Sequence, residues 1–160
     1  MAIKDDNFSV SEHRWHSDEY VEEWIERDIQ RDDERRPRLQ RMLSLANFPG
    51  DSAIVVIDIG GGYGVVSEEI LKAWPHARVT LQDFSAPMLA RARQRLAKYL
   101  GQVEFLRSDL RDQSWSEPMR ETFDLVVSAI AIHNLYDARL IEHCYGGIFR
   151  LLKPSGLFLD

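Results

Sequence analysis

Short apolar runs alternate along most of this chain with longer stretches in which apolar residues recur at helical spacing. Five runs predict strands, at residues 53–57, 77–82, 103–106, 123–129 and 157–160. Three helices are predicted between them, over residues 65–74, 85–100 and 137–152. Because strands and helices alternate, we expect an α/β fold with a parallel sheet, helices on both faces and right-handed crossovers.

Several residues support the predicted helix boundaries. Ser85 and Asp137 stand where N-caps are expected, and Pro87 suits the first turn of its helix. Within the last predicted helix, Gly146 and Gly147 each cost about 1 kcal/mol relative to alanine. We therefore expect either a very close packing partner or a bend at this point.

The amino-terminal part of the chain has helical spacing without strands. Ser17 is a suitable N-cap, and Asp18 and Glu19 place negative charge at the positive end of the helix dipole. A second helix is predicted with Pro37 in its first turn. The two apolar stripes consist of Tyr20, Val21, Trp24, Ile25 and Ile29, and of Leu39, Met42, Leu43 and Ala46.

A glycine-rich turn follows the first predicted strand. The stretch V-V-I-D-I-G-G-G-Y-G carries Asp58 and then Gly60, Gly62 and Gly64. Glycine can take positive φ and lets a ligand approach the backbone, while the helix that follows directs free N–H groups at that ligand. The dinucleotide pattern G-x-G-x-x-G is excluded because Val65 stands where its third glycine belongs. A triphosphate-binding loop is excluded because no Lys-Ser or Lys-Thr follows.

Composition narrows the classes of function. The 160 residues include 20 basic and 26 acidic side chains, and the net charge of −6 argues against general nucleic-acid binding. Cys144 is the single cysteine, so no disulfide can form within the chain. No apolar run approaches the roughly 20 residues of a membrane span, and the N-terminus lacks the apolar region of a signal peptide. We expect a cytoplasmic protein that has no membrane association and no metal site.

Five stretches together resemble the successive motifs of class I S-adenosylmethionine-dependent methyltransferases, in the order and at the spacing of that family. They are V-I-D-I-G-G-G-Y-G, V-T-L-Q-D-F-S-A-P-M-L-A-R-A-R, F-L-R-S-D-L, F-D-L-V-V-S-A-I-A-I-H-N-L and L-L-K-P-S-G-L-F-L, within residues 53–159. Departures from the family pattern are small, with Gly61 where cysteine is frequent and Ser155 where a second glycine is common. Neither departure affects the predicted cofactor site.

The resemblance implies a three-layer, Rossmann-like doubly wound sheet with parallel strands in the order 3-2-1-4-5. Residues 51–160 would form this cofactor-binding domain, and residues 1–50 a helical lid over the cofactor. The family's sixth and seventh strands are missing, so we expect a fragment, a natural short form or an edge that another chain covers. An open edge strand invites pairing, which favours a homodimer or a further segment at the fifth strand.

The resemblance also implies the roles of residues at the carboxyl ends of the strands, where ligands bind in such sheets. The loop from Gly60 to Gly64 would hold S-adenosylmethionine, and Asp58 would either hold this loop or contact the cofactor. The other predicted contacts are Asp83 on the ribose, Phe84 on the adenine face, Asp109 and Leu110 on the adenine edge, and Ser128 beneath the sulfonium.

The implied reaction is in-line transfer of the methyl group to a nucleophilic atom of the acceptor, for which we expect a small molecule. His133 follows the fourth strand, on the acceptor's side, and an imidazole can take a proton near neutral pH. Alignment alone also suffices in many methyltransferases, so we consider two alternatives, His133 as a catalytic residue and no base at all. A non-catalytic S-adenosylmethionine-binding module, or a truncated partner of an active enzyme, is the alternative function.

Overall fold

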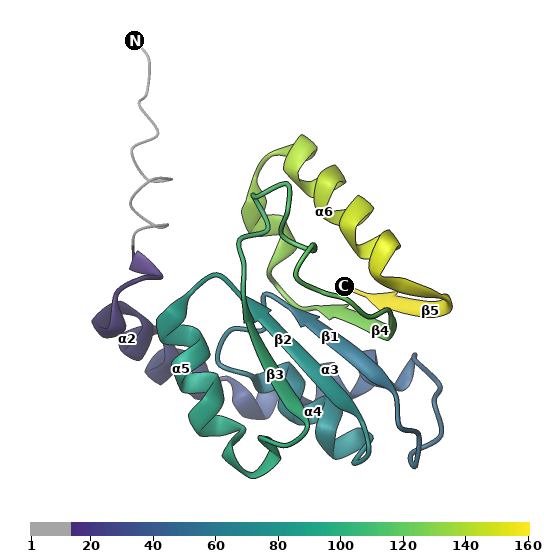
Figure 1. Ribbon diagram of the computed structural model, residues 1–160. Coiled ribbons are helices and arrows are strands. Elements are labelled where there is room, and N and C mark those ends of the chain that lie inside the picture. The colour runs from purple at the N-terminus through teal and green to yellow at the C-terminus, as the bar shows by residue number, and fades with distance from the viewer. Residues whose placement is uncertain (1–13) are drawn as a thin grey trace.

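The computed structural model describes residues 14–160, so the first part of the predicted 1–50 extension lies outside the described residues. Five parallel strands form one sheet in the order β3-β2-β1-β4-β5 (Figure 1). The predicted fold class and strand order are confirmed. The strands are β1 (Val55–Ile59), β2 (Arg78–Asp83), β3 (Val103–Arg107), β4 (Phe123–Ser128) and β5 (Leu152–Leu159).

Helices cover both faces of this sheet. They are α2 (Asp18–Ile29), α3 (Asp32–Ser44), α4 (Val65–Ala73), α5 (Ala86–Arg95) and α6 (Ala138–Leu151), with 3₁₀ turns η1 (Ala97–Tyr99) and η2 (Ile132–Leu135). Side chains of α3, α4 and α5 share one core with the sheet, and α6 packs on the opposite face (Figure 1). The chain therefore has the three layers of a doubly wound α/β fold.

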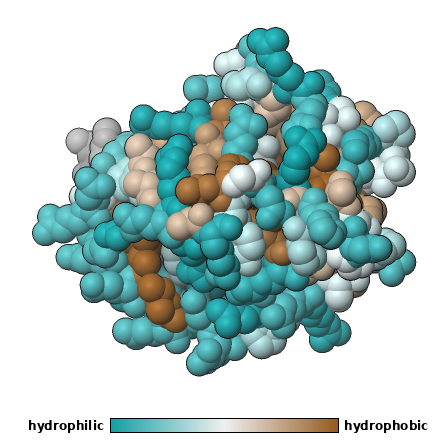
Figure 2. Space-filling view, turned by 60° about the horizontal axis from the view of Figure 1, so that its bottom comes forward, coloured by the Kyte–Doolittle hydropathy of each residue, from teal (hydrophilic) through white to brown (hydrophobic). Residues whose placement is uncertain are grey.

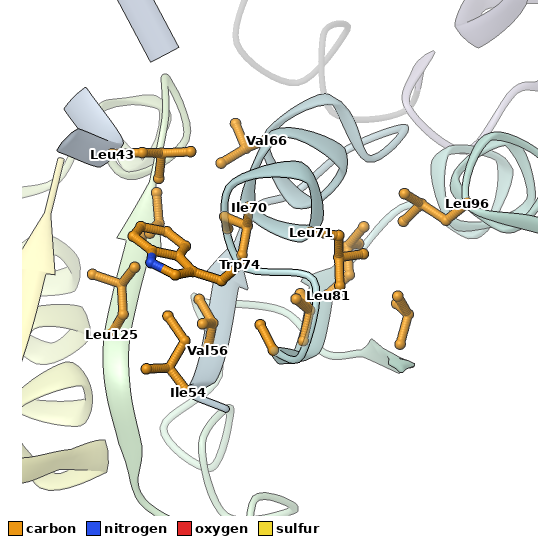
Figure 3. Close-up of a cluster of buried hydrophobic side chains, with 14 of the residues drawn as sticks. Leu43, Ile54, Val56, Val66, Ile70, Leu71, Trp74, Leu81, Leu96 and Leu125 are labelled. Atoms are coloured by element: carbon orange, nitrogen blue, oxygen red, sulfur yellow. The ribbon is translucent and has the colours of Figure 1, made fainter. Parts of the chain in front are cut away.

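The core beneath α4 is centred on Trp74 (Figure 3). Its indole lies among Leu43, Val56 and Leu125, which come from α3, β1 and β4. The indole N–H donates to the carbonyl oxygen of Phe48 at 3.3 Å, so the polar atom of this buried ring is satisfied. Burial of each such apolar side chain stabilises the fold by about 1.5–3 kcal/mol.

The two glycines of α6 have different surroundings. A Cβ atom on Gly147 would lie 2.5 Å from Cζ2 of Trp115, whereas one on Gly146 would meet only Nη1 of Arg150, at 3.6 Å. Trp115 is buried in the core beneath α6. The close packing partner predicted from the glycine pair is thus Trp115, and Gly147 provides the space for it.

The predicted N-caps are confirmed. The side chain of Ser17 accepts from the Tyr20 N–H, that of Ser85 from the Met88 N–H, and that of Asp137 from the Arg139 N–H. Each bond satisfies one of the free N–H groups at a helix start. These local signals involve neighbours in sequence, which is why the pattern alone could reveal them.

Some predicted boundaries were wrong. Pro37 lies inside α3 rather than in its first turn, because the helix already begins at Asp32. The acidic first turn of α3 suits the positive end of the helix dipole. Pro37 has no N–H to donate to the carbonyl of Asp33, but Asp33 is exposed, so this carbonyl can bond to water. The first strand covers Val55–Ile59 rather than 53–57, because pairing with both β2 and β4 extends to Ile59.

Two later boundaries differ as well. The helix predicted over 85–100 ends at Arg95, and Leu100, placed on its apolar stripe, is 53% exposed. The predicted turn K-P-S-G lies within β5 as an irregularity, where pairing shifts between Phe123–Leu152 and Leu125–Leu157. The second difference reflects strand pairing, which strand periodicity does not register.

The surface is mostly hydrophilic on the face that Figure 2 shows, with apolar side chains interspersed among polar ones. No helix among residues 14–160 is long and apolar enough to cross a membrane. A hollow of about 410 Å³ lies between α3 and the end of α4, lined by Leu43, Phe48, Lys72 and Trp74 among others. It lies toward the amino ends of the strands, away from the glycine turn.

Candidate functional site

The glycine turn adopts a backbone that requires glycine. Gly60, Gly62 and Gly64 have φ angles of +63°, +52° and +88°. These angles lie in the left-handed region, which is unfavourable for residues with a Cβ atom. A Cβ atom on Gly60 would also lie 2.3 Å from that of Ala131, in the segment after β4. The turn is therefore shaped both by its own dihedral angles and by the neighbouring loop.

Residues at the end of β2 hold this turn in place. The Gly60 N–H donates to Oε1 of Gln82 at 2.9 Å, and the Gly61 N–H donates to the carbonyl oxygen of Gln82 at 2.9 Å. The Gly62 N–H donates to Oδ2 of Asp83, also at 2.9 Å. Three consecutive N–H groups of the turn are thus directed at β2.

Asp83 is buried and forms the last residue of β2, rather than following it as predicted. Its second oxygen accepts from the Ser85 N–H at 2.8 Å. Burial raises the pKa of Asp83, while hydrogen bonds from the backbone N–H groups of Ser85, Gly62 and Phe84 oppose that rise. Because each carboxylate oxygen has two acceptor directions, these bonds leave capacity for a further donor.

Asp58 lies within β1 and beneath the turn, 1% exposed. Its Oδ2 accepts from the Ser67 hydroxyl at 2.7 Å, in the first turn of α4, whereas its Oδ1 has no hydrogen-bond partner among the described residues. Burial raises the pKa of Asp58 to about 7, with a smaller contribution from the charge of Asp83. The contact with Ser67 supports a role in fixing the start of α4 behind the turn.

The residues after β3 form a second group at the same end of the sheet. The carboxylate of Asp109 accepts from Arg111 through both oxygens, with Nη2 of Arg111 at 2.5 Å from Oδ2. The guanidinium carbon of Arg111 also lies 5.9 Å from the centroid of the half-buried Phe84 ring. The side chain of Leu110 is buried in the core beneath α6. Sequence reasoning missed Arg111 because a basic residue two positions after an acid has no distinctive pattern.

The end of β4 completes the arrangement. Ser128 is fully buried, and its hydroxyl has no hydrogen-bond partner within residues 14–160. Ile130 then takes a φ of +61°, which is unusual for a β-branched residue, and turns the chain toward the glycine loop. His133 is exposed on η2. No group of three side chains that could hold a metal ion is found in the described part of the chain.

The amino-terminal helices meet this end of the sheet as well. The Ser85 hydroxyl donates to the carbonyl oxygen of Trp15, and the rings of His16 and Phe84 meet edge to face with centroids 5.4 Å apart. Tyr63, from within the glycine turn, packs against α2. Sequence reasoning missed both Tyr63 and Gln82, although a glutamine in the otherwise apolar run V-T-L-Q was a detectable signal.

Comparisons with known proteins agree with this arrangement. Residues 56–156 match the methyltransferase domain family, and the chain belongs to this family of S-adenosylmethionine-dependent methyltransferases. The resemblance seen in the sequence is confirmed, and with it S-adenosylmethionine as the family's cofactor.

Curated relatives carry enzyme names. The chain is 33% identical over 113 residues to a malonyl-[acyl-carrier protein] O-methyltransferase from Magnetococcus marinus, covering 71% of this chain and 39% of the relative. It is 42% identical over 129 residues to a trans-aconitate 2-methyltransferase from Rhodopseudomonas palustris, covering 78% and 48%. The chain thus spans less than half the length of these relatives.

Solved structures share the fold. An S-adenosylmethionine-dependent methyltransferase from Clostridium acetobutylicum superimposes with a TM-score of 0.66 at 16% identity, over 84% of this chain and 55% of that one. An O-methyltransferase family protein from Burkholderia thailandensis gives a TM-score of 0.65 at 24% identity, over 77% and 36%.

Proposed function

We propose that this chain binds S-adenosylmethionine and takes part in methyl transfer to a small-molecule acceptor. The observation that carries the proposal is the glycine turn, which has three left-handed glycines and is held at the carboxyl end of β2 by bonds from Gly60 to Gln82 and from Gly62 to Asp83. The buried hydroxyl of Ser128, at the end of β4 beside β1, supports it, because this hydroxyl has no hydrogen-bond partner among the residues that the structure describes. A buried polar atom without a partner is costly, and a bound ligand would satisfy it.

The residues at the carboxyl ends of β1, β2 and β3 would each contact a different part of a nucleoside cofactor. The turn from Gly60 to Gly64 would hold the cofactor, Asp83 would accept from the ribose, and Phe84 would face the adenine. Asp109 would accept from the adenine amino group, and the Leu110 N–H would donate to the ring. In this assignment Arg111 orients the Asp109 carboxylate, and Asp58 stabilises the turn from below.

The chain's contribution to the reaction is chiefly alignment. The acceptor's nucleophilic atom would take the methyl group from the cofactor's sulfur by in-line displacement. Holding the reacting atoms in line can contribute roughly 7–11 kcal/mol. His133, exposed on η2 after β4, is the residue we propose to contact the acceptor and accept its proton.

We further propose that α2 and the residues just before it form the part of the predicted 1–50 lid that reaches the cofactor, whereas α3 packs in the core on one face of the sheet. The contacts of Trp15 and His16, which precede α2, with Ser85 and Phe84 support this role, since they lie beside the proposed nucleoside site. The acceptor class is drawn from the names of the relatives, malonyl-[acyl-carrier protein] and trans-aconitate, which both denote carboxylic acids.

Calorimetry with S-adenosylhomocysteine and with NAD tests the cofactor assignment. We expect binding heat with S-adenosylhomocysteine and none with NAD. No heat with S-adenosylhomocysteine would refute the proposal. Turnover with carboxylic-acid acceptors, followed by mass spectrometry, then tests the activity. Binding without turnover across that panel would favour a non-catalytic cofactor-binding module, the alternative function.

The β5 edge is the remaining candidate for a partner. β5 is one of the two outer strands of the sheet, and Phe149 of α6 and Leu157 of β5 are 78% and 39% exposed. We propose that a second copy or a further segment pairs with this edge, because an unpaired strand attracts another. Light scattering that shows only monomer at high concentration would exclude the homodimer.

A further inference from the structure

We propose that Tyr63 is a positioning residue whose hydroxyl couples the order of α2 and α3 to the shape of the glycine turn. This inference rests on the proposed function, because it concerns how the same cofactor site is held ready. We call the set of Asp28, Asp32, Arg35 and Tyr63 the Tyr63 network.

The side chain of Tyr63 leaves the glycine turn and enters the helical layer. Although its backbone stands between Gly62 and Gly64, its ring is 5% exposed and belongs to a cluster with Val21 and Ile25 of α2. The rings of Trp24 and Tyr63 meet edge to face with centroids 6.1 Å apart. The apolar face of α2 therefore packs on a side chain of the turn itself.

An arginine of α5 also contacts the Tyr63 ring. The guanidinium carbon of Arg95, on α5, lies 5.1 Å from the Tyr63 centroid. Arg95 also pairs with Glu68 of α4 at 2.9 Å. The Tyr63 ring is thus held between α2 and Arg95 of α5. This packing limits the conformations of the glycine turn that carries Tyr63.

The hydroxyl of Tyr63 joins three segments of the chain. It donates to Oδ2 of Asp28 at 2.8 Å, in the last turn of α2, and accepts from Nη2 of Arg35 at 3.1 Å, in α3. Arg35 also binds Asp28 and Asp32, each at 2.5 Å. Burial and the carboxylate of Asp28 raise the pKa of Tyr63 to about 12, so the hydroxyl keeps the proton that it donates.

The network can transmit order because α2, one of the elements that it joins, is otherwise held lightly. Only Val21 and Ile25 of α2 are buried, and helices with few buried contacts open locally at low free-energy cost. In the turn, left-handed backbone flanks Tyr63 on both sides, with φ of +52° at Gly62 and +88° at Gly64. Fixing the side chain between them restrains both dihedral angles.

Coupling of this kind is reciprocal. If an ordered α2 favours the binding-ready turn, then a ligand bound to the turn must also make α2 more ordered. A tyrosine that merely fills the core would contribute through its ring, and loss of the hydroxyl would not change the response of α2 to ligand. The two roles therefore differ in a measurable way.

The test compares Tyr63→Phe, which keeps the ring, with Tyr99→Phe, which removes the hydroxyl of a ring that Lys98 covers in η1, at the other end of the sheet. Hydrogen exchange of the α2 amides and calorimetry are measured with and without S-adenosylhomocysteine. For Tyr63→Phe we expect about tenfold weaker binding, because a hydrogen bond to a charged group is lost. We also expect its α2 exchange to be faster and to slow less on adding ligand.

Tyr99→Phe should match the wild type in both measurements. The proposal is overturned if Tyr63→Phe retains wild-type affinity, or if its α2 amides are protected by ligand as strongly as those of the wild type. A wild-type protein that binds no S-adenosylhomocysteine would instead refute the proposed function. A double-mutant cycle of Tyr63→Phe with Asp28→Ala, read by urea unfolding, measures the hydroxyl–carboxylate contact without ligand. Additive losses in that cycle would also overturn the proposal.

Discussion

The side-chain oxygen of Gln82 accepts a hydrogen bond from the Gly60 N–H at 2.9 Å, while its amide nitrogen donates to the carbonyl oxygen of Ser108 at 2.6 Å. Gln82 is 1% exposed. One buried amide therefore joins the glycine turn after β1 to the residue that precedes Asp109 after β3. These two segments carry opposite ends of the proposed cofactor site, so Gln82 sets their relative position.

Gln82→Glu should destabilise the fold at neutral pH by about 1–3 kcal/mol, because the replacement loses the donor to Ser108 and leaves that carbonyl unsatisfied. Its charge would also be buried near Asp83. Urea unfolding measures the loss. Gln94→Glu, at an exposed position on α5, is the matched control and should change stability little. Equal effects of the two substitutions would show that the Gln82 amide has no special role.

Asp83→Asn should weaken binding of S-adenosylhomocysteine by about 1–3 kcal/mol, because a neutral amide is a poorer acceptor for ribose hydroxyls than a carboxylate. The side chain also holds the Gly62 N–H, so some loss could come from the turn. A cofactor analogue without ribose hydroxyls separates the two effects by calorimetry. We expect a smaller loss for the analogue, and Asp51→Asn, at an exposed site before β1, should have no effect. Equal losses for both ligands would contradict the ribose contact.

The pKa of Asp58, raised to about 7 by burial, predicts how stability depends on pH. The unfolded chain releases this proton at about pH 4, whereas the folded protein keeps it until about pH 7. The stability contribution of Asp58 is therefore fully present below about pH 4 and falls as pH rises to about 7. Asp58→Asn cannot ionise, and its amide oxygen can still accept from Ser67.

The free energy of unfolding of Asp58→Asn, relative to the wild type, should therefore increase by up to about 4 kcal/mol across that pH range and level off above it. Urea unfolding at a series of pH values measures this difference, in which the titration of the other carboxylates largely cancels. A difference that stays constant with pH would mean that Asp58 titrates normally in the folded protein.

Much of the fold was predictable because its signals are local. The caps at Ser17, Ser85 and Asp137 bond to residues two or three positions away, and the glycine turn requires backbone angles that glycine favours. Strand order followed from the family resemblance. These features involve near neighbours or a known motif, so one sequence is enough to find them.

The unpredicted features depend on residues far apart in sequence. Tyr63 meets Asp28 across 35 positions, and Gln82 meets Ser108 across 26, so neither contact has a periodic pattern. The start of β1 at Val55 was missed for a similar reason, since pairing rather than hydrophobicity sets it. Roles for the candidate site residues came from the resemblance, and they remain predictions for the experiments above.

His133→Asn should lower kcat about a hundredfold with an accepted substrate, if the imidazole takes the acceptor's proton. Affinity for S-adenosylhomocysteine should remain unchanged, because His133 lies on η2 beyond the proposed cofactor contacts. His143→Asn on α6 is the control, because the His143 ring contacts the Gln113 carbonyl and has no part in the proposed site. A variant of His133 with wild-type kcat over the whole pH range would leave alignment as the sole source of catalysis.

The adjacent glycines of α6 should respond to alanine with opposite signs. Gly146→Ala should stabilise the protein by about 1 kcal/mol, because alanine has the higher helix propensity and its Cβ meets only the flexible end of Arg150, at 3.6 Å. Gly147→Ala should destabilise it by about 1–3 kcal/mol despite the same gain, because its Cβ would lie 2.5 Å from the Trp115 ring. Urea unfolding of the two variants, supported by tryptophan fluorescence, measures both effects. If both substitutions stabilise, the Trp115 indole can move at little cost, and the packing described beneath α6 does not constrain the helix.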